Sequence, residues 1–225
     1  MVKSWKKEPS KQICIHKGKK SLLEFINCMQ PPSLWYPWHL HAEGMEEEGK
    51  PSLIRLVMVD YSDRKNTKSV YANLKPKEVK WLYHMIFMMV KEVSFSQQKI
   101  FRKDKSLDEG VVTCLRITRQ ETDGNGAKRE LPWYIEIRNG TGIAVRNSAG
   151  GEFCKKGSFR EKKKVCINLS DADAYMLLVE VITVIYQCER EHLFHRRDVD
   201  NLNKLLKRIG GLIEKKEEKG KDLAA

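Results

Sequence analysis

The chain has 225 residues, of which 41% are hydrophobic and 32% charged, and its 42 Lys and Arg against 30 Asp and Glu give a formal net charge of +12. Apolar residues recur in regular patterns, which excludes a disordered chain, and no uninterrupted apolar stretch approaches the roughly 18 residues of a membrane span. Six cysteines without a C-x-x-C pair, and an N-terminus without the apolar block of a secretory signal, predict an intracellular protein with reduced cysteines. Nucleus, organelle and bacterial cytoplasm all remain open.

Residues 1–11 are expected to form a flexible basic arm, in which Pro9 disfavours a helix. The first folded unit, 12–93, contains strand-like segments at 13–16, 22–28, 36–42, 53–60 and about 68–74. Pro76 and Glu78 suit the first turn of a helix that is predicted to run to about Val93. Although five segments have strand-like patterns, we expect a unit of four strands followed by a helix.

A polar linker, 94–110, is expected before the second unit, 111–191. This unit is predicted to have strands at 111–119, 131–138, 142–146 and 162–169, with turns at 123–126, 139–140 and 150–151. Ser170 is a favourable N-cap for a helix over about 171–191. The remainder, 192–225, is predicted to be an amphipathic helix over about 199–217 and a tail, with Gly210-Gly211 weakening the helix.

The chain nearly repeats itself at an interval of ninety-five positions. Pro37-Trp38 recurs as Pro132-Trp133, and Val70-Tyr71-Ala72-Asn73-Leu74 recurs as Val165-Cys166-Ile167-Asn168-Leu169. Leu82, Ile86 and Val90 of the first helix are answered by Leu177, Val181 and Ile185. A shared interval across three segments predicts one supersecondary unit used twice.

Alternation along the Pro-Trp strands separates a more apolar face from a polar one. Trp38 and Trp133 lie on the apolar faces, so both are predicted to pack beneath the helices. The outward side chains, which could contact a ligand, are Trp35, His39, Tyr134 and Arg138.

Binding of nucleic acid without sequence preference needs cations for the phosphates and flat rings for the bases. Residues 1–20 hold seven lysines against one acid, and residues 151–165 hold six Lys and Arg against two Glu, with Phe153 and Phe159 between them. Such runs can also be solvated loops, but both lie next to predicted strands. The candidate nucleic-acid-binding residues are Lys17, Lys19, Lys20, Trp35, His39, Arg55, Arg116, Arg119, Tyr134, Arg138, Lys155, Lys156, Phe159, Arg160, Lys163 and Lys164.

The predicted order of elements, four strands and a helix given twice, resembles the Whirly family and its relatives with the positive-cofactor-four fold. Ile15-His16-Lys17-Gly18-Lys19-Lys20-Ser21-Leu22 is similar to the Lys-Gly-Lys-Ala-Ala-Leu signature of Whirly proteins, with Lys20 and Ser21 in place of the alanines. The resemblance covers about residues 12–190 in topology, and PUR-repeat proteins offer a second analogy. It implies single-stranded DNA or RNA held along the sheets of an oligomer, often a tetramer. For Lys17, Lys19 and Lys20 it implies a role in binding or in higher assembly.

Catalysis is not expected, because no nucleophile, general base or phosphate-binding glycine loop stands out. His39 and His41 lie two apart on a predicted strand, a spacing compatible with a metal, but no third ligand is evident. We therefore expect no cofactor and no metal.

These patterns predict an α+β protein in which two β-β-β-β-α repeats form one pseudo-twofold, Whirly-like domain with antiparallel sheets. The predicted function is binding of single-stranded DNA or RNA with low sequence specificity by a homo-oligomer, with no membrane partner. The alternative is a protein-interaction or assembly module, or a basic architectural protein without a single-strand preference.

Overall fold

The computed structural model describes residues 11–30, 51–102, 104, 106–148 and 150–222, without the side chains of 192–200 and 210–222. The chain divides into two compact units, residues 1–28 with 53–184, and residues 29–52 with 185–225. All the described strands and the helix α1 belong to the first unit.

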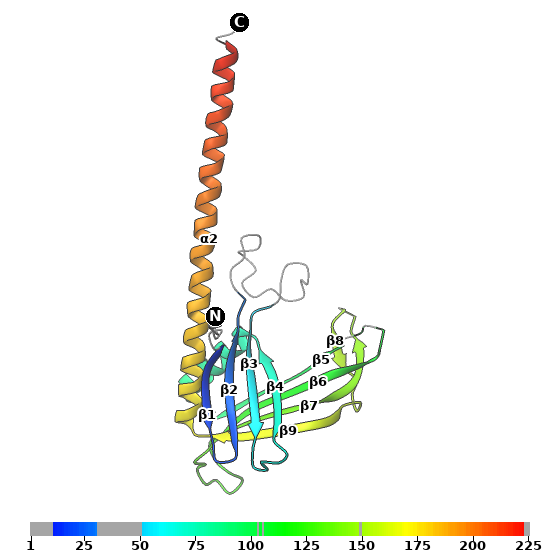
Figure 1. Ribbon diagram of the computed structural model, residues 1–225. Helices are drawn as coiled ribbons and strands as arrows, with labels where there is room; N and C mark the ends of the chain where they lie inside the picture. Colours follow the sequence, from blue (N-terminus) through cyan, green and yellow to red (C-terminus); the bar gives the residue numbers. More distant parts are fainter. Residues whose placement is uncertain (1–10, 31–50, 103, 105, 149, 223–225) are drawn as a thin grey trace, which may run out of the picture. The chain divides into compact units, whose positions relative to one another are not determined.

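The first sheet, sheet A, is an antiparallel meander of β1 (Gln12–Lys17), β2 (Ser21–Cys28), β3 (Leu53–Asp60) and β4 (Lys68–Leu74) (Figure 1). Alternate apolar side chains are buried on its inner face, among them Leu23 and Phe25 of β2 and Leu56 of β3, as a sheet with one covered face requires. The four predicted strands that fall on described residues are confirmed. The predicted strand 36–42 lies outside the described residues.

The helix α1 (Pro76–Phe87) begins as the sequence indicates and ends earlier. Pro76 occupies its first turn, and the Lys75 backbone N–H donates to the Glu78 carboxylate at 2.7 Å. Met88 closes the last turn, and Met89 takes a left-handed φ of 52°. That conformation stops a helix, so the predicted continuation to Val93 is wrong.

The second sheet, sheet B, is also antiparallel. It consists of β5 (Glu92–Phe101), β6 (Glu109–Gln120), β7 (Trp133–Arg146), the short β8 (Glu152–Cys154) and β9 (Arg160–Leu169), in the order β5-β6-β7-β8 with β9 also paired to β7. Most of the expected linker 94–110 therefore belongs to strand β5 and the start of β6. Ser94, Ser96 and Gln98 are exposed on the outer face of β5, and these polar residues on an edge strand account for the linker-like composition.

The turn predicted at Asn139-Gly140 is wrong, because β7 runs through both residues. The pairing of β7 with β9 shifts register there, which makes a β-bulge. A Cβ on Gly140 would lie 2.0 Å from the backbone carbonyl oxygen of Arg160. Glycine is needed at this position for the close approach of β9.

The helix α2 (Asp171–Asp222) is one continuous helix, coloured from yellow to red in Figure 1. The prediction of two separate helices, at about 171–191 and 199–217, is therefore wrong. Its start is as predicted, since the Asp173 backbone N–H donates to Ser170 Oγ at 3.1 Å. No glycine or proline separates residues 191 and 199, and the helix also passes through Gly210-Gly211. Neither of the two described helices is long and apolar enough to cross a membrane.

The expected α+β fold with two antiparallel sheets is present, and each sheet is followed by a helix. The ninety-five-residue interval relates β4 to β9, in which Leu74 and Leu169 are both buried. Leu74 lies opposite Ile54 on β3, and Leu169 lies opposite Trp133 on β7. By strand register, Ile54 thus occupies the place in sheet A that Trp133 occupies in sheet B. Trp38, the predicted counterpart of Trp133, lies outside the described residues.

The core of the first unit lies between the two sheets and the helices. A small apolar cavity there is lined by residues of β2, β4, α1, β6, β7, β9 and α2: Leu23, Phe25, Leu74, Leu82, Ile117, Trp133, Ile135, Leu169, Ala174, Leu177 and Leu178. Trp133 is 2% exposed, which confirms its prediction as a core residue.

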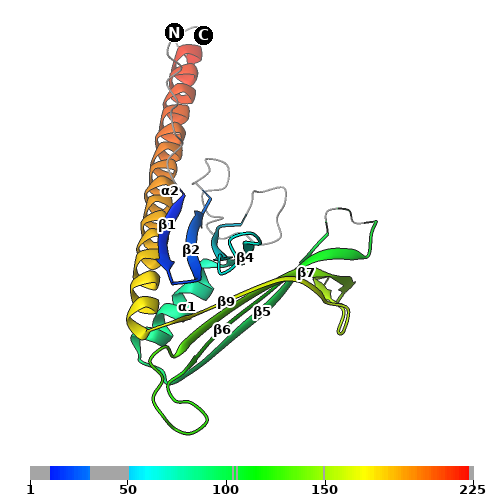
Figure 2. The same ribbon diagram turned by 60° about the horizontal axis from the view of Figure 1, so that its bottom comes forward.

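Sheet B also covers the free edge of sheet A with polar side chains. Asn139 Oδ1 accepts the Tyr71 backbone N–H at 2.9 Å, and Asn139 Nδ2 donates to the Tyr71 carbonyl at 3.1 Å. Gln97 and Lys99 donate to the Asn73 carbonyl at 3.0 and 2.9 Å. Side chains of sheet B thus satisfy the N–H and carbonyl of Tyr71 and the carbonyl of Asn73 on the β4 edge without another strand. The long strands of sheet B continue past sheet A toward β8 (Figure 2).

Candidate nucleic-acid interface

The outer face of sheet B, the face turned away from the core, carries three of the predicted cations. Strand register places Arg116 of β6 beside Glu136 of β7, and Arg138 of β7 beside Lys164 of β9. Arg116 is exposed and has no ion pair among the described residues. Ser96 of β5 lies opposite Arg116 on the same face, so this part of the face can meet a hydrated, charged ligand.

Glu136 lies at the centre of this face and is only 7% exposed. Its carboxylate accepts the Tyr134 hydroxyl at 2.6 Å and the Lys164 Nζ at 2.7 Å, and Arg138 Nε lies 3.2 Å away. Burial alone would raise the pKa of Glu136, but the hydrogen bonds from Lys164 and Tyr134 and the charges of Lys164 and Arg138 outweigh it and lower the pKa. Glu136 therefore neutralises part of the charge of both cations.

Tyr134 is held by the same carboxylate. Burial, followed by its hydrogen bond to Glu136, raises the pKa of the Tyr134 hydroxyl, so the phenol stays neutral at any physiological pH. The sequence placed this ring facing outward, and the structure places it half-buried on the outer face of sheet B.

The edge strand β9 and the turn before it carry a second set of cations, which we call the β9 edge. All of its side chains are exposed, and none has an ion pair with a described carboxylate: Lys155, Lys156, Arg160, Lys162 and Lys163. Lysine on an edge strand also discourages pairing with another sheet. The six residues from Arg160 to Val165 include four cations. That is more positive charge than the protection of a strand edge requires.

A third set of cations, the turn cluster, lies where two hairpins of sheet A meet. In an antiparallel meander the β1–β2 and β3–β4 turns fall at the same end of the sheet, and Ser21 is opposite Asp60. The cluster joins the three predicted lysines to three cations of the second turn: Lys17, Lys19, Lys20, Arg64, Lys65 and Lys68, all exposed.

Hydrogen bonds fix the two turns against each other. The Tyr61 hydroxyl donates to the carbonyls of Gly18 and Ser21, and the Tyr61 N–H donates to the Lys20 carbonyl at 2.9 Å. Asp60 accepts the Ser62 N–H at 2.9 Å. The hydrogen bonds from Ser62, followed by the charges of Lys68 and Lys20, lower the pKa of Asp60, and this acid offsets only part of the cluster's charge.

The outer face of sheet A pairs a cation with an aromatic ring. Arg55 of β3 donates from Nε to Asn73 Oδ1 at 3.1 Å, and its guanidinium carbon lies 5.3 Å from the centre of the Tyr71 ring. Tyr71 is 47% exposed. The pair presents two flat groups of the kind on which bases stack.

Arg119 does not belong to any of these surfaces, although the sequence grouped it with them. It is 3% exposed, and its guanidinium binds Asp171 at the start of α2. The register of β6 explains this, because Arg119 lies opposite Trp133 on the inner face, whereas Arg116 lies on the outer one.

Phe159 is half-buried against the small apolar cluster of Val112, Cys114 and Cys154. The guanidinium carbon of Arg138 lies 5.7 Å from the centre of its ring. One face of this ring is therefore already occupied. Trp35 and His39 lie outside the described residues.

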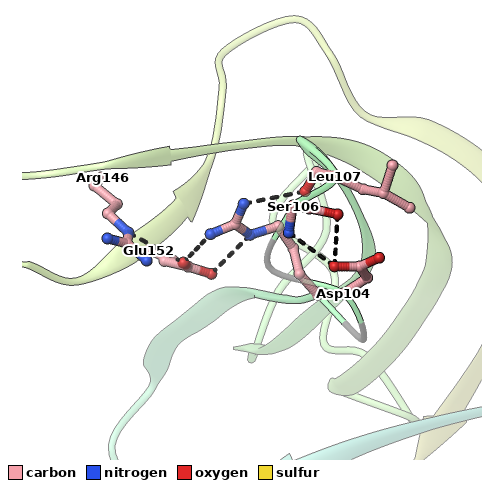
Figure 3. A network of polar contacts seen from close by, with 6 residues as sticks. Asp104, Ser106, Leu107, Arg146 and Glu152 are labelled. Atoms are coloured by element: carbon pink, nitrogen blue, oxygen red, sulfur yellow. Dashed lines mark hydrogen bonds and ion pairs between the residues drawn. The ribbon is translucent and has the colours of Figure 1, made fainter.

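Arg102 and Arg146 have a structural role, because both form ion pairs with Glu152 of β8. Figure 3 labels Arg146, Glu152 and the loop residues Asp104, Ser106 and Leu107. Arg102 binds the Glu152 carboxylate through Nε at 3.3 Å and also through Nη2, and Arg146 Nε lies 3.3 Å from the same carboxylate. Asp104 accepts both the N–H and the hydroxyl of Ser106, at 2.8 and 2.7 Å. These contacts join the β5–β6 loop region to β8.

Sequence reasoning missed several exposed groups. Arg64, Lys65 and Lys68 join the turn cluster, Tyr71 stacks with Arg55, and Trp81 on α1 is 40% exposed beside Phe95 of β5. The turn cluster had a usable signal, since alternate turns of a meander share one end of the sheet. No pattern in the sequence indicated that the Tyr71 and Trp81 rings are exposed.

Among the described residues, no group of three or more His, Cys, Asp or Glu could hold a metal ion. His39 and His41, the pair considered in the sequence, lie outside these residues.

No protein-family model matches this chain, and no curated protein matches it. Among solved structures, that of the plant transcriptional regulator PBF-2, a Whirly protein, is similar at a TM-score of 0.43. The two share 12% sequence identity over 84% of this chain and 94% of that one.

Proposed function

We propose that this protein binds single-stranded nucleic acid, DNA or RNA, with low sequence specificity. The observation that carries the proposal is the β9 edge, where five exposed cations follow one strand and its turn without a described carboxylate partner. A line of cations along an extended strand suits a line of phosphates, and the formal charge of +12 attracts polyanions to the surface as a whole.

The outer face of sheet B continues this edge inward. Lys164 belongs to the same strand, and Arg138 lies beside it on β7. We propose that the phosphates follow the β9 edge and that bases turn toward Arg116, Arg138 and the Tyr134 ring. Contacts to phosphates and stacking carry little sequence information, which accounts for the low specificity.

The preference for a single strand rests on the flat groups next to the cations. Guanidinium and aromatic planes can stack on bases only where those bases are unstacked from one another and accessible, as in a single strand. We propose a binding protein without catalytic activity of its own, which works as a homo-oligomer.

A titration of labelled oligo-dT and oligo-U at two salt concentrations tests the proposal. Binding should weaken steeply with salt, and the double charge reversal Lys162→Glu/Lys163→Glu should lower the slope of log K against log salt by about 1.4, at about 0.7 per lost phosphate contact. The matched control is Lys204→Glu/Lys207→Glu on α2, which makes the same change in net charge. No binding of either oligonucleotide at low salt would refute the proposal.

A duplex competitor separates the alternatives. Poor competition supports single-strand binding, and equal competition supports a basic architectural protein. Binding of an acidic protein or of heparin, with no binding of any nucleic acid, supports an assembly module instead.

A further inference from the structure

An open pocket lies between α1 and β5, the strand at the edge of sheet B opposite β9. The pocket has a volume of about 520 Å³ and is lined by three residues of α1 and three of β5: Lys77, Glu78, Trp81, Ser94, Phe95 and Ser96. All six belong to the first compact unit. β5 comes first in the strand order of sheet B, so its outer edge has no neighbour among the described strands. We call this site the β5 pocket.

The β5 pocket contains an aromatic ring that the fold leaves partly uncovered. The helix α1 buries Val79, Leu82 and Ile86. Trp81 lies outside this stripe, and 40% of its surface is exposed. The ring centres of Trp81 and Phe95 are 6.0 Å apart and the rings are tilted by 37°, so Phe95 contacts only part of the indole. A large flat ring exposed in a pocket suits a planar ligand.

Strand register connects the β5 pocket with the candidate nucleic-acid interface. On the outer face of sheet B, Ser96 of β5 lies opposite Arg116 of β6. In the next row, Ser94 lies opposite Thr118, and Thr118 lies opposite Tyr134 of β7. Two strand spacings separate Ser94 from Tyr134, about 10 Å, a distance that about three nucleotides can span. One single strand can therefore contact the outer face and the pocket together.

The charge next to the pocket suits a polyanion. The start of α1 and the residue before it carry Lys75, Lys77 and Lys80 against one acid, Glu78. The Glu78 carboxylate accepts the Lys75 backbone N–H at 2.7 Å and thereby caps the helix. The phosphates on either side of a base in this pocket would thus lie in a region of net positive charge.

The side chains of the β5 edge favour a base over a protein partner. An extended peptide that adds to a sheet edge gains its specificity from pockets for alternate side chains. The exposed outer side chains of β5 are polar, namely Ser94, Ser96 and Gln98, and they provide no row of apolar pockets. A base needs one flat ring and nearby polar groups, which Trp81, Lys77 and the serine hydroxyls supply.

We propose that the β5 pocket holds one unstacked base of the bound nucleic acid, stacked on Trp81, while the strand crosses the outer face of sheet B toward β9. This inference rests on the proposed function and adds a contact at the edge opposite the β9 edge. The pocket offers a hydrogen-bond donor in Lys77, an acceptor in Glu78 and hydroxyls that do both. It can therefore accept any base, in keeping with low sequence specificity.

Titration of labelled oligo-dT against the full chain tests the proposal. Trp81→Ala should weaken binding by about 5- to 150-fold, the range typical for removal of one stacking ring, and should leave the slope of log K against log salt unchanged. Trp81→Phe keeps a flat ring and should bind within about threefold of the native chain. The control Tyr186→Ala removes a ring that is 52% exposed on α2, in the second unit, and should not change the affinity.

Two further measurements make the result decisive. The urea unfolding midpoint of Trp81→Ala should stay far above the conditions of the titration, which shows that the variant is folded. Photocrosslinking of the native chain to oligo-dT that carries 4-thiothymidine needs no variant, and peptide mass spectrometry should locate a crosslink at Trp81.

The two proposals fail in different ways. Native affinity in Trp81→Ala, or crosslinks on sheet B without one at Trp81, would overturn the assignment of the β5 pocket and leave the proposed function intact. A native chain that binds no oligonucleotide at low salt would refute the proposed function itself, and the β5 pocket with it.

Discussion

The Arg119 guanidinium binds both carboxylate oxygens of Asp171, with Nε 2.8 Å from Oδ1 and Nη2 2.9 Å from Oδ2. The Trp133 indole N–H donates to the same Oδ1 at 2.7 Å, and Arg119 Nη1 donates to the carbonyls of Val90 and Lys91, both at 2.9 Å. This ion pair therefore connects β6, β7 and the segment before β5 with the first residue of α2.

Asp171→Asn should destabilise the first unit by about 2–3 kcal/mol. The substitution leaves the buried Arg119 without an anion, which is costly, while the 34% exposure of the Asp171 side chain keeps the loss below that of a fully buried pair. Urea unfolding followed by far-ultraviolet circular dichroism measures the change. Glu180→Gln, an exposed substitution on the same helix, should change stability by no more than about 0.5 kcal/mol, and an equal loss in both variants would contradict the assigned role of the pair.

The same pair should steepen the loss of stability in acid. The hydrogen bond from Arg119 lowers the pKa of Asp171, so near and below pH 4 the unfolded chain binds a proton at this carboxyl more readily than the folded chain does. The stability that Asp171 contributes is therefore present above about pH 4 and is lost as pH falls through the lowered pKa. Unfolding midpoints between about pH 2 and 6 should show a shallower acid limb for Asp171→Asn than for the native chain, and parallel limbs would count against the prediction.

Glu136→Gln should strengthen binding of oligo-dT. The neutral amide still accepts the Tyr134 hydroxyl, but it releases Lys164 and Arg138 from a carboxylate. We expect affinity at low salt to rise about two- to fivefold and the salt slope to increase by about 0.7–1.4, because one or two more phosphates can be neutralised. A Glu180→Gln variant changes the net charge equally on α2 and provides the control. If the Glu136→Gln variant binds oligo-dT no more tightly than the native chain does, the nucleic acid binds somewhere other than the outer face of sheet B.

The cysteines provide a footprint of the interface. Cys166 is exposed on the outer face of sheet B, in register with Arg116 and Glu136. Cys14 is buried, and burial followed by the charge of Glu180 raises the pKa of its thiol to about 12. Thiolate is the reactive form, so alkylation at pH 8 should modify Cys166 and spare Cys14.

Saturating oligo-dT should slow the alkylation of Cys166, which peptide mass spectrometry can follow residue by residue. Cys188 on α2, half-buried in the second unit, serves as the internal control and should react at the same rate with and without oligonucleotide. Equal rates at Cys166 with and without bound oligonucleotide would exclude the outer face of sheet B as the binding surface.

The sequence by itself determined the α+β class, the strands β1 to β4, the first residues of both helices, the burial of Trp133 and the basic charge. These properties follow from local alternation, capping residues and composition, which do not depend on the partner of each strand. The glycine at position 140 shows the limit of such reasoning, because a local pattern reads it as a turn, and only the approach of the Arg160 carbonyl identifies a bulge.

Only the tertiary structure decided which cations can meet a ligand. Arg116 and Arg119 are three residues apart on β6, and an odd spacing places them on opposite faces of the sheet. Which face is buried depends on the packing of sheet B against sheet A and the helices, and this packing directs Arg119 to Asp171 and leaves Arg116 exposed. The turn cluster likewise exists because the meander brings two distant hairpin turns to one end of sheet A.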